Sequence, residues 1–139
     1  MKLNPRNTRR LAIVVLAFGT SCAPYGSGNA TVCAAHTSRH SHIETDATGT
    51  ISRLLHESHG RYGPHAQFLV RLDSSCALTV RVAANEAFTG RLPLRVGEHV
   101  RVRGEYEYYR RGGVIHWTHR DPRGHHDNGF IELRGRLYE

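Results

Sequence analysis

The chain has 139 residues, of which 39% are hydrophobic, and a formal net charge of +7, which together favour a single globular domain. Four of the positive charges lie within the first ten residues, so the remainder carries +3 and its basicity is weak support for nucleic-acid binding. Lys2 is the only lysine, which excludes a P-loop phosphate clamp and a Schiff-base nucleophile from the rest of the chain.

Residues 1–22 have the order of a secretory signal, in which a basic segment precedes an apolar run and small residues. The apolar run, residues 11–19, reaches about half the length that a helix needs to span a bilayer. We therefore expect export to the periplasm or cell envelope. Cys22 stands where a lipoprotein signal places its lipidated cysteine, so a lipid-anchored protein and a soluble secreted protein both stay open.

Residues 23–46 are rich in Gly, Ser, Thr, Ala and His and show almost no apolar periodicity. We interpret this segment as a flexible lead-in whose histidines are solvated. Outside the signal the chain has two cysteines, Cys33 and Cys76. An even pair in an oxidising compartment favours a disulfide between them, with two separate thiols as the alternative.

From residue 47 onward the pattern indicates β structure. Alternating apolar residues are clearest in 65–73 and 78–82, which we expect to form a hairpin. Residues 85–93 are the one stretch able to hold a helical turn, and Pro93 limits it. Further strands are expected over residues 48–56, 94–108, 113–119, 130–133 and 136–138.

We therefore predict an all-β domain over residues 47–139, a small OB-like barrel of five or six strands with one short helical connection. An SH3-like barrel and a small sandwich are the alternatives. In the strand over 94–108, arginines and glutamates alternate with apolar residues and share the outer face. We expect them to form solvated Arg–Glu pairs, which contribute little to stability.

Residues 112–129, GGVIHWTHRDPRGHHDNG, hold the densest group of chemistry-bearing side chains. On a regular strand His116 and His119 point to opposite faces and cannot bind one ion. Asp121 begins a type I turn with Pro122 second, and a loop folded back by that turn can bring His125 near His119.

Several motifs in this half of the chain resemble an uncharacterised bacterial family of short exported proteins, domain of unknown function 3465. The similarity spans residues 48–139 and is concentrated in 104–138. The motifs are GEYE at 104–107, GGVIHWTH at 112–119, DPRG at 121–124, then His126, Gly129 and the closing residues 135–138. The resemblance implies a shared small β fold and carries no established activity. Phe130 stands where the family is expected to have a tryptophan.

Two functional hypotheses remain, since the chain has no G-x-S-x-G, H-E-x-x-H or C-x-x-C motif. The first is an envelope binding module for an anionic or glycan-like ligand or a protein partner, presenting His116, Trp117, His119 and Arg123.

The second hypothesis is a metal-dependent hydrolase, phosphodiesterase-like, whose divalent ion would be held by His119, Asp121, His125 and Asp127. We favour binding, because no acid–base pair is fixed by spacing. Nucleic acid is not an expected partner, and membrane contact is expected only through a lipid on Cys22.

Overall fold

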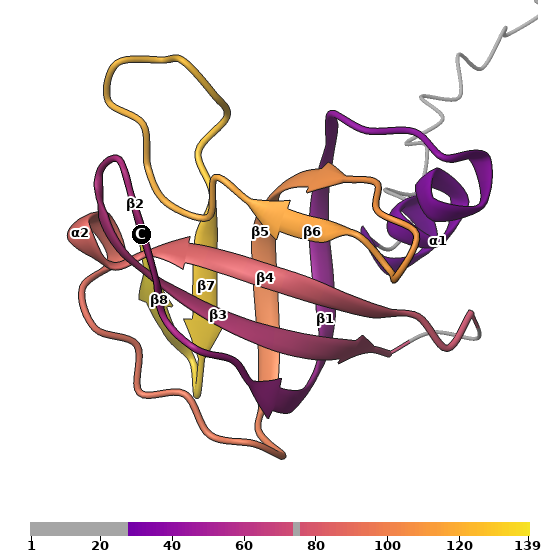
Figure 1. Ribbon diagram of the computed structural model, residues 1–139, viewed down its shortest axis with the longest axis horizontal. Helices are drawn as coiled ribbons and strands as arrows, with labels where there is room; N and C mark the ends of the chain where they lie inside the picture. The colour runs from indigo at the N-terminus through magenta and orange to yellow at the C-terminus, as the bar shows by residue number, and fades with distance from the viewer. Residues whose placement is uncertain (1–27, 74–75) are drawn as a thin grey trace, which may run out of the picture.

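A computed structural model describes residues 28–73 and 76–139, and the elements are labelled in Figure 1. The signal segment and Cys22 lie outside these residues. Within them, no helix is long and apolar enough to cross a membrane. In chain order the elements are α1 (Gly28–Ser38), β1 (Ile43–Leu54), β2 (Ser58–Gly60), β3 (Gly63–Leu72), β4 (Thr79–Asn85), α2 (Glu86–Thr89), β5 (His99–Glu107), β6 (Val114–His116), β7 (Phe130–Leu133) and β8 (Arg136–Tyr138).

Five of the strands close into a barrel. They follow the order β1-β3-β4-β6-β5, and pairing of β5 with β1 completes the ring. The β4–β6 pair is parallel and the other pairs are antiparallel. The β7–β8 hairpin extends from the edge of β5 beyond β6, and β2 pairs with β3. The prediction of a small all-β barrel is confirmed.

The barrel interior is filled by the alternating apolar residues of its strands. Phe68 and Val70 on β3 face inward with Val80 and Val82 on β4, so the predicted hairpin is confirmed in position and in facing. The largest fully buried side chain is Tyr106 on β5, whose hydroxyl donates to the carbonyl oxygen of Gly112 at 3.1 Å. Such a bond satisfies the one polar atom that this ring takes into the core.

The predicted helical turn is α2, which begins after Asn85. The side chain of Asn85 accepts a hydrogen bond from the backbone N–H of Ala87 at 3.0 Å, an N-cap contact. Because β4 and β6 run parallel, the chain must cross the barrel between them, and α2 and β5 lie on that crossover.

The segment that composition marks as a flexible lead-in is ordered from residue 28, where it forms α1 and the first part of β1. Val32 is fully buried, and the amide of Asn29 donates to the backbone carbonyls of Thr48 and Asp73 at 2.9 and 3.0 Å. Cys33 on α1 forms the predicted disulfide with Cys76. A few anchoring residues therefore hold a helix that lacks a strong apolar stripe.

Candidate functional site

A groove of about 760 Å³ opens at one end of the barrel. The β2–β3 connection, α2 and the long loop that follows β6 form its walls, and in Figure 1 this loop projects from the barrel. Rings and cations dominate the lining. Its residues are Gly60, Arg61, Tyr62, His65, Ala83, Asn85, Phe88, Glu105, His116, Trp117, His119, Arg120, Asp121, Pro122, Arg123, His125 and His126.

Trp117 sets the shape of the groove through its backbone. It has a φ of 53°, in the left-handed region that non-glycine residues seldom occupy, and β6 ends at the residue before it. Strand alternation therefore stops at Trp117. Consequently His116 and His119, which a regular strand would place on opposite faces, both line the groove.

Four rings from three segments lie in contact along the groove. His119 stacks on Phe88 of α2 with ring centroids 4.2 Å apart, and its edge meets His126 at 4.8 Å. Trp117 stacks on the same His126 ring, with ring centroids 4.6 Å apart. Trp117 is 39% exposed and Phe88 is 50% exposed, so both residues present a large ring area to solvent.

His119 is buried within this set of rings. Its Nδ1 lies 2.7 Å from the carbonyl oxygen of Arg120, and a ring nitrogen that faces a carbonyl must carry the proton. In the neutral ring Nε2 then has the free lone pair. Burial lowers the pKa of His119, outweighing the bond to Arg120 that raises it, so the neutral form is favoured.

Asp121 holds the loop together rather than facing the groove with a free carboxylate. Its oxygens accept the backbone N–H groups of Arg123 at 2.9 Å, of His125 and of His126 at 3.1 Å. Asn128 accepts the backbone N–H of Asp121 at 2.9 Å. Burial alone would raise the pKa of Asp121, but the three backbone donors outweigh it and lower that pKa.

The four predicted metal ligands therefore divide between roles. Asp121 caps the turn, His125 lies 3.6 Å from Asp121, and the carboxylate of Asp127 is exposed. Within residues 28–73 and 76–139, the one group of three ligating side chains whose donor atoms lie within 4.8 Å of one another is His42, Glu105 and Glu107, which shares no residue with this set. The set His119, Asp121, His125 and Asp127 stays a prediction from the sequence.

The groove carries positive charge at its rim. Arg61 and Arg123 have no ion pair among the described residues, whereas Arg120 pairs with Glu139 at 2.9 Å. A second hollow of about 440 Å³ differs in this respect, because its arginines are paired internally. There Arg134 contacts Glu98 at 2.6 Å. The groove is thus the better place for an external anion.

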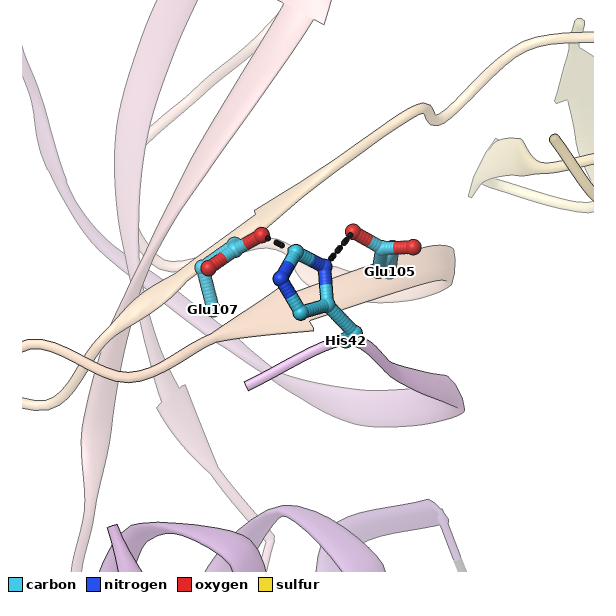
Figure 2. A group of neighbouring side chains, drawn as sticks. All are labelled: His42, Glu105 and Glu107. Atoms are coloured by element: carbon cyan, nitrogen blue, oxygen red, sulfur yellow. Dashed lines mark hydrogen bonds and ion pairs between the residues drawn. The ribbon is translucent and has the colours of Figure 1, made fainter. Parts of the chain in front are cut away.

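One wall of the groove ends in a cluster of His42, Glu105, Glu107 and His116, hereafter the His–Glu cluster. Nδ1 of His42 lies 3.1 Å from Oε1 of each glutamate, as Figure 2 shows. The expected Arg–Glu pairing is therefore wrong at this end of β5, where the glutamates face histidines. At the other end of β5 an arginine does pair with carboxylates, since Arg101 contacts Asp46 at 2.6 Å and Glu132 at 3.5 Å.

The two histidines of the cluster have opposite tendencies. The hydrogen bond to Glu105, and next the charge of Glu107, raise the pKa of His42. Burial lowers the pKa of His116 even though the same carboxylates oppose that shift. We did not predict from the sequence that these glutamates and histidines meet. Antiparallel pairing of β5 with β6 places Glu105 opposite His116, so a correct prediction of that pairing was the one available signal.

Comparison with known proteins gives one match. A family described as "Protein of unknown function (DUF3465)" matches residues 13–139. No curated protein and no solved structure matches the chain.

Proposed function

The chain belongs to the DUF3465 family, and we propose that it is a binding module whose groove takes a small anionic ligand bearing a flat or sugar ring. The observation that carries the proposal is that one groove combines exposed rings with arginines that have no ion pair in the described part of the chain. Trp117 and His126 offer ring faces, and Arg123 lies on the same loop. Pockets with aromatic walls and a few placed polar groups are typical of small-ligand sites.

The backbone of Trp117 supports the same conclusion. A left-handed residue with a side chain costs roughly 1–2 kcal/mol, so a fold retains one where surrounding structure or function requires it. Here the strained residue is the sole tryptophan of the chain and its ring is exposed over the groove. A core role would bury that ring.

The arginines define the charge of the ligand. Arg61 and Arg123 approach the groove from the β2–β3 connection and from the loop after β6. A guanidinium offers a planar fork that matches carboxylate or phosphate. The ligand therefore carries one of these groups beside its ring, as a nucleotide or an acidic glycan does. OB-type barrels bind oligonucleotides and oligosaccharides on one face of the barrel and the loops around it. This comparison is an analogy between folds and assigns no residue.

The proposal includes export. The order of residues 1–22 and the Cys33–Cys76 disulfide support an oxidising compartment outside the cytoplasm. The mass of the mature N-terminus, measured on protein from the envelope fraction, tests it and also decides lipidation of Cys22. An unprocessed chain recovered from the cytoplasm would contradict it.

Titration of Trp117 fluorescence tests the binding proposal directly. The probes are a nucleoside monophosphate, a uronic-acid oligosaccharide and a neutral oligosaccharide. We expect one of the two anions to change the emission and the neutral sugar to leave it unchanged. Substitution Arg123→Gln should weaken binding by roughly tenfold or more, the effect of losing one charge-assisted hydrogen bond.

Arg95→Gln is the matched control, since Arg95 is exposed and does not line the groove. It should bind like the unaltered protein. If neither anion perturbs Trp117, or if both substitutions weaken binding equally, the groove is not the site.

A further inference from the structure

The His–Glu cluster gathers four side chains from β5, from β6 and from the residue that precedes β1. Glu105 and Glu107 lie on the outer face of β5, His116 lies opposite Glu105 on β6, and His42 directly precedes β1. Because β1 and β6 flank this end of β5, both histidines reach over the same two carboxylates. Figure 2 shows the ring of His42 between Glu105 and Glu107.

The carboxylates of the cluster lack the arginine partner that Asp46, Glu98 and Glu132 have. The side chains of Glu105 and Glu107 are 19% and 23% exposed, and among the described residues histidines are their only ion-pair partners. Two mostly buried carboxylates this close together repel each other unless a cation lies between them. Arginine supplies that cation for Asp46 on β1, and none supplies it here.

The second histidine has an unused nitrogen aimed into the cluster. Nε2 of His116 is inaccessible to solvent and has no hydrogen-bond partner among residues 28–73 and 76–139. It lies 3.5 Å from Oε1 of Glu105 and 3.7 Å from Oε1 of Glu107. These separations are those of ion pairs and exceed a good hydrogen bond, so the two carboxylates satisfy this buried nitrogen only weakly.

The separations match those of a coordination shell. Ligand atoms about 2.0–2.1 Å from one tetrahedral zinc ion lie roughly 3.4 Å from each other. Nδ1 of His42 lies 3.1 Å from Oε1 of each glutamate, and the donor atoms of His42, Glu105 and Glu107 all lie within 4.8 Å of one another. Nε2 of His116 lies 3.5 and 3.7 Å from the same two oxygens but does not belong to that group. One imidazole nitrogen and two carboxylate oxygens suit first-row transition metals, and a pair of carboxylates balances a double positive charge.

We propose that His42, Glu105 and Glu107 of the His–Glu cluster bind one divalent first-row transition-metal ion, with zinc the best match, and that His116 lies beside the two carboxylate ligands. The site goes beyond the proposed ligand groove, although it adjoins it through Glu105 and His116. His42 and Glu107 do not line the groove. Substitutions at these two positions therefore test the metal without removing a groove contact.

The test uses purified protein that carries no histidine tag and has been stripped with a chelator. Calorimetry with Zn²⁺, and visible absorption with Co²⁺ as a coloured substitute, should give one strongly bound equivalent. Substitutions His42→Ala and Glu107→Gln should each lower zinc affinity by at least tenfold, since even residues behind the ligands change it by that factor.

Two further pairs of substitutions give the controls. His59→Ala removes an exposed histidine outside the cluster, and Glu44→Gln removes a carboxylate that lies beside the cluster without belonging to it. Both substitutions should leave the zinc affinity unchanged. His125→Ala and Asp127→Asn address the other predicted metal set. If these two abolish binding while His42→Ala does not, the cluster is not the site.

A change in folding is separated from a change in binding by thermal unfolding of each stripped variant. His42→Ala should unfold near the temperature of the stripped parent, because His42 is exposed. Failure of the parent to retain one equivalent of Zn²⁺ or Co²⁺ would overturn the proposal. Arg123→Gln should bind metal normally, so the groove proposal and the metal proposal can fail independently.

Discussion

Trp117 stacks on His126 with ring planes 22° apart and centroids separated by 4.6 Å. The first residue directly follows β6, and the second lies on the loop that returns toward β7. Since Asp121 accepts the backbone N–H of His126, the turn that begins at Asp121 positions the second ring of this pair. The emission of the sole tryptophan therefore reports on the order of the whole loop.

Asp121→Ala should loosen the loop without unfolding the barrel. The substitution removes the acceptor for the backbone N–H groups of Arg123, His125 and His126. We expect faster hydrogen exchange at these amides and a change of Trp117 emission. Asp127→Ala is the control, because the Asp127 carboxylate makes no hydrogen bond or ion pair within the described part of the chain, and equal effects of both variants would contradict the turn's role.

Trp117→Ala should affect the groove more than the fold. The ring is 39% exposed, and an aromatic pair contributes roughly 0.5–1.5 kcal/mol. The free energy of unfolding should therefore fall by about 1–2 kcal/mol, less than the roughly 3–5 kcal/mol that removal of a fully buried tryptophan costs. Trp117→Gly should be at least as stable as Trp117→Ala, since glycine relieves a φ of 53°. Urea unfolding followed by circular dichroism measures both, and a loss above about 3 kcal/mol would assign Trp117 to the core.

Gly113→Ala should be strongly destabilising. A Cβ at this position would lie 2.4 Å from the ring of Tyr106, and Gly113 has a φ of 87°. Overpacking costs about 1–3 kcal/mol and the left-handed backbone about 1 kcal/mol more. Gly124→Ala isolates the backbone cost, because its φ is 71° and nothing lies within 4 Å of the added carbon. Similar unfolding midpoints for the two variants would show that the Tyr106 contact yields easily.

Loss of the disulfide should release α1 from the barrel. Cys33 and Cys76 are 43 residues apart, and closing a loop of that size stabilises a protein by about 2–4 kcal/mol. We expect Cys76→Ser to lower the denaturation midpoint and to expose α1 amides to exchange. An unchanged midpoint would mean that Val32 and Asn29 alone hold the helix.

Acidification should destabilise the ring set through His119. Its pKa in the folded protein is lower than the ordinary value of 6.5. In the interval between those values the unfolded chain binds more protons, so stability rises with pH and is lost as pH falls below 6.5. His119→Gln should flatten this dependence in urea titrations. His42 acts oppositely, because its raised pKa stabilises the protein below 6.5 and that contribution is lost as pH rises through the folded value.

NMR titration of the imidazoles in metal-stripped protein checks the order of these groups. His42 should lose its proton at a higher pH than His116, for which burial lowers the pKa. The reverse order would contradict the arrangement of the His–Glu cluster.

The class of fold and the positions of most strands could be predicted from the sequence, whereas β2 and the first part of β1 could not. The alternation in β3 and β4 is local, so inward Phe68 and Val70 could be assigned without knowledge of their neighbours. The pair Cys33 and Cys76 followed from counting cysteines in a chain that we expect to be exported, and the structure confirms the disulfide. The order of α1 escaped prediction because contacts between residues distant in the sequence hold it, among them the burial of Val32, the hydrogen bonds of Asn29 and the disulfide, and no apolar periodicity marks such contacts.

Which side chains come together in the groove and in the His–Glu cluster depends on the tertiary structure and could not be predicted from the sequence. The left-handed backbone of Trp117 cancels strand alternation and turns His116 and His119 toward one groove, an outcome that a regular strand forbids. His42 and Glu105 lie 63 residues apart and meet because β1 pairs with β5 in one particular register. Register depends on the packing of whole strands against a shared core, whereas periodicity reports only on one strand at a time.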